Sequence, residues 1–334
     1  MANEDTTCQV CGKTFDTIRG LHIHLKGHKI TQAEYYCRHF PRLNKLTGEP
    51  LPFKNRSDYF NKDFANYDQL LKWCSTASIE EVKPYILEQL SRRIKEKELK
   101  FGPCHLEMAQ KEMPPIELYK KIFGSYTWAC EAAGVEPLYN KKVKEQFFVE
   151  DEKFNDLNIF IDTREQQPLT FKNSESVKLD FGDYTLGGDN YNYTFVDRKS
   201  EGDFLITFSS GFKRFQKEMD RVVQFDSFLY IVIESDLEQI KNNNDRLKAA
   251  IAINKNKAAK DRNPKMRQFA ANLDYIYYNM RKLIRDYPRK CQFIFTGSRE
   301  ASERIIPRLL FFGKELWQAD VQYFIEQNGI SGKN

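Results

Sequence analysis

Residues 182–200 have the sequence GDYTLGGDNYNYTFVDRKS, and this stretch decides the fold of the second half of the chain. Two runs rich in Val, Tyr, Thr and Phe, 176–186 and 191–199, flank the turn-forming residues GGDN at 187–190. β-Branched and aromatic residues on both sides of a glycine-rich turn are typical of strands that fold back on each other as a hairpin. We therefore predict one strand over each run, joined by this turn.

Further strands are expected before and after the hairpin. LNIFIDT at 157–163 predicts a buried strand, FLYIVIE at 228–234 one that is buried on both faces, and QFIFTG at 292–297 a last strand. A polar, basic stretch follows residue 234, and helices are expected at 201–225, 265–287, 299–312 and 314–328. Strands mixed with covering helices predict an α/β domain over residues 151–334.

Composition sets limits on the class of protein. The chain has 334 residues, of which 41% are hydrophobic and 30% charged, and this balance is typical of a globular protein. Its net charge of +5 suits a polyanionic partner. It lacks a run of about 18 apolar residues, so we expect no membrane partner.

The cysteines and the polar N-terminus indicate an intracellular protein. The start of the chain, MANEDTTCQVC, lacks the apolar core of a signal peptide. Five of the seven cysteines are scattered rather than arranged as a disulfide framework, namely Cys37, Cys74, Cys104, Cys130 and Cys291. This usage favours a reducing compartment. We expect the cytoplasm, or the nucleus if the source is eukaryotic, and not secretion.

Residues 1–30 carry the spacing of a two-Cys, two-His zinc finger. The pattern is Cys8-x2-Cys11-x12-His24-x3-His28. Two thiolates on a tight turn and two imidazoles one helical turn apart can close a tetrahedron around Zn²⁺. Phe15 and Leu21 supply the small core of a ββα unit, and zinc would provide the folding free energy that so short a segment lacks. The alternative is a chance spacing with a free pair of cysteines.

The finger has no good base-reading side chains. The usual reading positions of such a helix fall on Thr17, Gly20 and Ile23, which hydrogen-bond poorly to base edges. His22 is expected at the surface, away from the ligands. The finger is therefore expected to bind either phosphates or another protein, and we favour binding to the phosphates of the DNA backbone.

Residues 31–150 are predicted to be a mainly helical region that ends in a charged linker at 141–156. Within it, PPIELYKKIFGSYTWACEAAG at 114–134 resembles the small helical repeat found beside homing endonuclease domains, which has the pattern P-x4-Y-x3-F-G-S-W-x2-A-x2-A-G. Tyr126 stands where that repeat usually has Trp. The resemblance implies a helix-turn-helix-like DNA binder, and the alternative is a helical spacer whose aromatic residues form a core.

Acidic and basic residues gather at the ends of the predicted strands. They are Asp162, Arg164, Glu165, Asp183, Asp197, Lys199 and Asp203. Asp197 and Lys199 are two residues apart on one strand, so their side chains share a face, and the hairpin brings Asp183 towards Asp197. Two carboxylates suit Mg²⁺ or Mn²⁺, and Lys199 would orient or activate a water and offset charge on a phosphate.

In this order the motifs resemble the nuclease domain of the XPF family. The family signature is GD, then E-R-K, three residues, then D, and here it stands as Gly182-Asp183 and Asp197-Arg198-Lys199-x3-Asp203. The upstream Asp162-x-Arg164-Glu165 is similar to the family's D-x-R-E, and the likeness extends over 157–312. It implies a restriction-endonuclease-like fold, a DNA substrate and catalytic Mg²⁺ or Mn²⁺. It also implies metal-binding Asp183 and Asp197, catalytic Lys199, and supporting Arg164, Glu165 and Asp203.

Two departures from the family pattern bear on function. Asp197 replaces the family's Glu, which would shift the metal slightly. The tandem helix-hairpin-helix module that commonly follows in this family is not found after residue 312, so recognition of branched DNA is put in doubt.

Basic residues beside the motifs are candidates for contact with DNA. The segment 241–267 contains nine Lys and Arg against two Asp. Its candidates are Lys255, Lys257, Lys260 and Arg262, and the helix after the motif adds Lys213 and Arg214. The alternative is that these charges only form a solvated surface.

The sequence as a whole predicts a modular, phage- or mobile-element-like DNA endonuclease with site-specific, homing-like cleavage. A structure-specific flap or junction endonuclease is the alternative within enzymes. A DNA-binding scaffold with an inactive nuclease fold is the alternative outside them. The family resemblance also implies a possible homodimer through the nuclease domain and the C-terminal helices.

Overall fold

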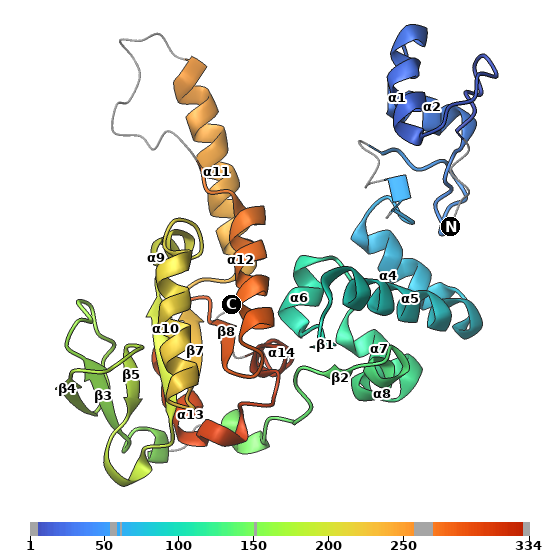
Figure 1. The fold of residues 1–334 in the computed structure, drawn as a ribbon. Coiled ribbons are helices and arrows are strands. Elements are labelled where there is room, and N and C mark those ends of the chain that lie inside the picture. Colours follow the sequence, from blue (N-terminus) through green and yellow to red (C-terminus); the bar gives the residue numbers. More distant parts are fainter. Residues whose placement is uncertain (1–5, 54–58, 61, 150–151, 257–269, 330–334) are drawn as a thin grey trace. The chain divides into compact units, whose positions relative to one another are not determined.

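A computed structural model describes residues 6–53, 59–60, 62–149, 152–256 and 270–329. The chain divides into two compact units, Met1–Ile86 and Leu87–Asn334, coloured along the sequence in Figure 1. The helical region expected over 31–150 therefore contributes to both units. No helix within the described ranges has the length and apolar character needed to cross a lipid bilayer.

The first unit begins with a small ββα-like module. A single antiparallel bridge between Thr7 and Thr14 precedes the first helix. The helices of this unit are α1 (Ile18–His24), the 3-10 turn η1 (Leu25–His28), α2 (Gln32–His39), α4 (Tyr67–Thr76) and the first part of α5 (Ile79–Lys97). The core comprises Cys8, Leu21, Leu25 and Tyr35, so α2 packs against the module and completes it.

The second unit opens with a small helical region. Its elements are β1 (Phe101–Gly102), α6 (His105–Gln110), α7 (Ile116–Phe123), α8 (Tyr126–Ala132) and β2 (Glu136–Pro137), and β1 pairs in parallel with β2. Gly124 turns the chain between α7 and α8 with a φ of 85°. A Cβ atom there would lie 2.6 Å from the Trp128 ring, so only glycine fits. The two short helices expected from the repeat pattern are thus present.

The helical region docks onto the C-terminal helix α14 (Val321–Gln327). The backbone N–H of His105 donates to Asp320 Oδ2 at 2.8 Å, and Asp320 also caps α14 by accepting from the Tyr323 N–H. The ring of His105 bonds Glu326 Oε2 at 2.7 Å, and Lys120 Nζ donates to the Tyr323 hydroxyl at 2.7 Å. One carboxylate therefore serves the first turns of two helices.

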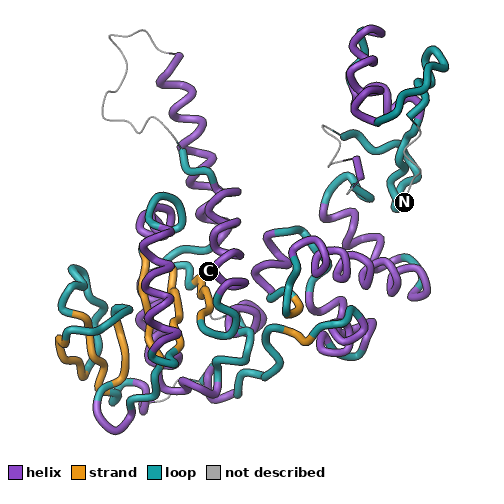
Figure 2. The backbone as a smooth tube through the Cα atoms, in the orientation of Figure 1, coloured by secondary structure: helices purple, strands orange, loops and turns teal. Residues whose placement is uncertain are grey.

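A six-stranded mixed sheet forms the centre of the second unit (Figure 2). Its strands are β3 (Asn158–Asp162), β4 (Asn173–Val177), β5 (Tyr184–Leu186), β6 (Thr194–Lys199), β7 (Phe228–Ile233) and β8 (Cys291–Phe295), in the order β4-β3-β5-β6-β7-β8. β5 is antiparallel to both β3 and β6, and the remaining pairs are parallel. The predicted hairpin is confirmed as β5 and β6.

Helices cover both faces of the sheet. Successive strand residues point to opposite sides, so both faces of the sheet carry apolar side chains, and helices bury them. The helices are α9 (Glu201–Thr207), α10 (Phe212–Gln224), α11 (Leu237–Asn256), α12 (Leu273–Asp286) and α13 (Arg299–Phe312), followed by the 3-10 turn η6 (Gly313–Glu315) and α14. Phe195 and Ile231 pack in one core with Phe215 of α10, whereas Val196 packs in the other with Ile305 of α13. The predicted mixed α/β architecture is confirmed.

Three predicted elements are interrupted. The single strand expected over 176–186 is wrong, because β4 ends at Val177 and β5 begins at Tyr184. Leu179 and Phe181 are buried in the connection between them, which makes the apolar pattern look continuous. The helix expected over 201–225 divides into α9 and α10 at 208–211, and the one over 314–328 into η6 and α14.

Two stretches predicted as a polar, basic segment and as a charged linker contain regular structure or buried residues. The helix α11 fills much of the region expected as a polar stretch, and it buries only Ile240, Asn244 and Ile251, which gives a weak amphipathic pattern. The linker predicted at 141–156 is also wrong in part, because Phe147 and Phe154 are buried in the core beside α13. The start of the helix expected at 265 lies outside the described residues.

Candidate active site

The hairpin brings two carboxylates to the same place. The paired register of β5 and β6 ends at Tyr184 and Val196, so Asp183 and Asp197 each lie one residue beyond this pair, at the same end of the hairpin. The Asp183 N–H donates to Val196 O at 2.7 Å, and Asp183 Oδ2 accepts from the Arg198 N–H at 2.7 Å. The backbone of β6 therefore fixes the position of the first carboxylate beside the second.

Lys199 completes this face of β6. Its ammonium donates to Asp197 Oδ1 at 2.9 Å and lies 5.1 Å from the ring centroid of Phe215. Burial alone would lower the pKa of Lys199, but the charge and hydrogen bond of Asp197 outweigh it and raise that pKa. Lys199 is therefore a charged, nearly buried group beside the carboxylates.

The carboxylates are held in an electrostatically costly arrangement. Burial, followed by the negative charge of Asp197, raises the pKa of Asp183 well above its usual value, while Lys199 acts in the opposite direction. A divalent cation would offset the repulsion between the two carboxylates, and oxygen donors of this kind suit Mg²⁺ or Mn²⁺. The residues present therefore fit the metal expected from the sequence.

A third carboxylate, which the sequence analysis missed, faces this site from α10. Glu218 Oε1 accepts a hydrogen bond of 3.0 Å from the N–H of Gly182. Burial, followed by the charge of Asp197, raises the pKa of Glu218. Gly182 has a φ of 68°, and a Cβ atom there would lie 3.1 Å from Val196 O. The sequence does contain a signal for Glu218. It stands three residues after Phe215 on an amphipathic helix, which puts its carboxylate at the edge of the buried face.

The D-x-R-E segment forms a local ion pair. Arg164 donates to Asp162 through its backbone N–H at 2.7 Å and through Nε and NH2 at 2.8 and 2.6 Å. Burial would raise the pKa of Asp162, but these hydrogen bonds lower it overall. The side chain of Arg164 is nevertheless 61% exposed, so it still presents surface to solvent.

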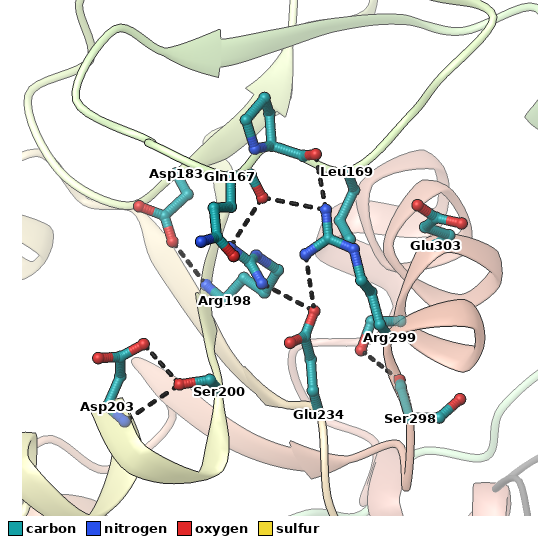
Figure 3. Close-up of polar contacts among 12 residues, drawn as sticks. Gln167, Leu169, Asp183, Arg198, Ser200, Asp203, Glu234, Ser298, Arg299 and Glu303 are labelled. Carbon is teal, nitrogen blue, oxygen red and sulfur yellow. Dashed lines mark hydrogen bonds and ion pairs between the residues drawn. The ribbon is translucent and has the colours of Figure 1, made fainter.

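Glu165 joins a buried network around Arg198, shown in part in Figure 3. The Arg198 guanidinium donates to Glu165 at 3.0 Å and to Glu234 at 2.8 Å, and its side chain is 8% exposed. Arg299 links the same Glu234 to the backbone carbonyls of Gln167 and Pro168. Arg198 alternates with Asp197 and Lys199 along β6, so this network occupies the opposite side of the strand.

Asp203 lies in the first turn of α9 and contacts the N-cap residue of that helix. Ser200 is the N-cap of α9, and its hydroxyl both accepts from the Asp203 N–H at 3.2 Å and donates to Asp203 Oδ2 at 2.6 Å (Figure 3). This reciprocal contact stabilises the start of α9 directly after Lys199. Asp203 thus positions the start of α9 through Ser200, and the structure shows no contact of its side chain with Asp183 or Asp197.

The four predicted finger ligands come together in the first unit. The ligand atoms of Cys8, Cys11, His24 and His28 all lie within 4.8 Å of one another. His24 Nε2 is 3.2 Å from Cys11 Sγ and 3.0 Å from His28 Nε2. In a tetrahedral zinc site, ligand atoms are about 3.3–3.8 Å apart, given bond lengths of about 2.0–2.3 Å. The cluster could therefore hold a metal ion with little adjustment.

The basic candidates for DNA contact lie in exposed positions where they are described. Lys213 and Arg214 are exposed on α10, the helix that carries Glu218. Lys255 is exposed near the end of α11. Lys257, Lys260 and Arg262 lie outside the described residues.

Comparison with solved structures finds structures of XPF from Aeropyrum pernix among its matches. XPF from Aeropyrum pernix has 16% identity and a TM-score of 0.30, covering 50% of this chain and 69% of that one. XPF from Aeropyrum pernix in complex with DNA has 16% identity and a TM-score of 0.28, covering 52% of this chain and 62% of that one. No protein-family model and no curated protein sequence matches the chain. Since these TM-scores are low, the assignment of function depends on the residues themselves.

Proposed function

We propose that this protein is a metal-dependent DNA endonuclease whose second unit has a restriction-endonuclease-like fold and hydrolyses phosphodiester bonds. The observation that carries the proposal is the end of the β5–β6 hairpin, where Asp183 accepts from the backbone of β6 next to Asp197 and Lys199 donates to Asp197. Two carboxylates and a charged lysine, fixed by strand geometry beside one another, form the donor set that such a reaction requires.

In this proposal, Asp183 and Asp197 hold Mg²⁺ or Mn²⁺. The cation would polarise the phosphoryl group and lower the pKa of water. Because Lys199 is charged, its contribution is electrostatic: it holds Asp197 in place and donates a hydrogen bond to a phosphate oxygen or to the attacking water. Asp203 and Ser200 fix the turn that follows Lys199, and Arg198 with Glu165 fixes the strand from its other face.

Binding of DNA is assigned to separate surfaces. We propose that the first 30 residues bind structural zinc and grip the DNA backbone, and that the α7–α8 pair is a second DNA-binding element. The exposed Lys213 and Arg214 of α10, together with Lys255, would contact phosphates near the active site. We favour cleavage at a specific sequence, which would depend on the α7–α8 pair because contacts to phosphates carry no sequence information. A homodimer through the nuclease domain would let two active sites cut both strands.

A cleavage assay tests the proposal. The purified protein, an Asp197→Ala variant and a matched Asp189→Ala variant would be incubated with Mg²⁺ and linear duplex, flap and junction DNAs. Asp189 lies exposed in the turn between β5 and β6, so its loss should leave cleavage unchanged. Loss of the metal ligand should reduce the rate by about 10²-fold or more, because positioned charge contributes effects of this size.

The substrate preference separates the remaining alternatives. Cleavage that depends on the DNA sequence supports the hypothesis of a homing-like endonuclease. Cleavage that depends on the branched structure of the DNA, whatever its sequence, supports a flap or junction endonuclease. If the unsubstituted protein binds DNA but cuts none of these substrates with Mg²⁺ or Mn²⁺, the scaffold alternative replaces this proposal.

A further inference from the structure

Glu218 stands apart from the other charged residues of α10. Its carboxylate points to the hairpin, where Oε1 accepts from the N–H of Gly182 at 3.0 Å. Its second oxygen, Oε2, has no hydrogen-bond partner among the described residues. By contrast, Lys213, Arg214 and Lys217 on the same helix are exposed. The helix thus presents one acid to the site and bases to solvent.

The negative charge of Glu218 exceeds what the local structure needs. A neutral amide would accept the hydrogen bond from Gly182 equally well, since the bond requires only a carbonyl oxygen. A third carboxylate near Asp183 and Asp197, with Lys199 as the balancing cation, adds repulsion that the folded chain must bear. A carboxylate rather than an amide at this position, directly beside a candidate metal site, is what binding of a cation there would require.

We propose that Glu218 is a positioning residue of the metal site and strengthens the binding of a divalent cation by Asp183 and Asp197. This inference rests on the proposed nuclease function. Within the described residues, three or more ligand atoms of His, Cys, Asp or Glu converge only in the finger cluster. Glu218 is therefore proposed to act on the cation indirectly and not as a direct ligand. Mg²⁺ retains several waters when bound to proteins, and Oε2 would accept from one of them.

The test measures binding of Mn²⁺ to the zinc-loaded protein by electron paramagnetic resonance. The variants are Glu218→Gln, which keeps the acceptor for Gly182, and Glu218→Asp, which keeps the charge. The control is Asp220→Asn, a carboxylate on the same helix that accepts from the Tyr287 hydroxyl instead. Glu218→Gln should weaken Mn²⁺ binding about tenfold or more, as removal of outer-shell partners usually does. Glu218→Asp should bind more tightly than Glu218→Gln, and Asp220→Asn should equal the unsubstituted protein.

The outcomes distinguish this inference from the function it rests on. If the unsubstituted protein binds Mn²⁺ and Asp197→Asn does not, but Glu218→Gln binds as tightly as the unsubstituted protein, Glu218 is only an acceptor for Gly182 and the inference is overturned. If the unsubstituted protein itself shows no saturable Mn²⁺ binding, the proposed function is overturned as well. Thermal unfolding of each variant shows whether it is folded, and an unfolded Glu218→Gln would overturn the inference, because it would show that the local structure itself requires the carboxylate.

Discussion

At the scale of single residues, three consecutive charges on β6 serve two separate purposes. Asp197 and Lys199 pair with each other on one face, whereas Arg198 between them pairs with Glu165 and Glu234 on the other. The strand alternation thus keeps the Arg198 guanidinium away from the Asp197 carboxylate. Removing Arg198 would leave two largely buried carboxylates without their partner, a situation that usually destabilises a fold strongly.

A second residue-scale feature gives a prediction about pH. Burial raises the pKa of Asp320 to about 6, against the opposing charge of His105. Because this pKa lies above that of the unfolded chain, the folded state holds more protons between pH about 4 and 6. The contribution of Asp320 is therefore fully present at low pH and is lost as the pH rises through 6.

We expect the difference in unfolding free energy between the unsubstituted protein and Asp320→Asn to fall as the pH rises from 4 to 7. A pKa unit corresponds to about 1.4 kcal/mol, so the change should be at most about 3 kcal/mol. Asparagine still caps a helix, so the variant should fold. Urea unfolding at several pH values measures the difference, and parallel curves for the two proteins would contradict the assigned pKa.

At the scale of elements, the sequence predicts what depends on short-range pattern. The hairpin, β3, β7, β8 and α13 follow from apolar runs and turn residues, and so does the shared face of Asp197 and Lys199. Elements whose buried residues are few or non-periodic are missed, as in α11 with its three buried side chains. The contacts of Glu218 with Gly182 and of Arg198 with Glu165 and Glu234 could not be predicted, because they join residues 33 to 36 positions apart in the chain.

The turn between α7 and α8 gives a prediction at this scale. Gly124→Ala should destabilise the second unit by about 1–3 kcal/mol, because the backbone is left-handed there and the new methyl group meets the Trp128 ring. Gly202→Ala is the matched control, since Gly202 lies in α9 with a Cβ position 3.9 Å from its nearest neighbour. Denaturant unfolding compares the two. Equal stability of both variants would mean that the turn is not built as described.

At the scale of the whole molecule, the boundary of the second unit lies well before the sheet. Leu106 and Leu138 of the helical region are buried in one core of the second unit, and Val143 and Phe147 are buried in the other. The domain boundary predicted at 151 would therefore cut through both cores. The unit that begins at Leu87 retains them.

We expect a fragment of residues 87–334 to unfold cooperatively and a fragment of residues 151–334 to aggregate or lack a cooperative transition. Each apolar side chain lost from a core costs about 1.5–3 kcal/mol, and a domain has only about 5–15 kcal/mol of stability. Circular dichroism during urea titration provides the comparison. A cooperative transition of equal midpoint in both fragments would show that the helical region is an independent attachment.

The contact between His105 and Asp320 also has a consequence for the order of events during protein synthesis. The two residues are 215 positions apart, and all six strands of the central sheet lie between them in the chain. While the chain emerges from the ribosome, α6 is made early but its capping carboxylate is made last, after β8. The helical region must therefore wait undocked until the sheet has been synthesised. Translation speed over the final helices would set how long its apolar side chains stay open to chaperones and proteases.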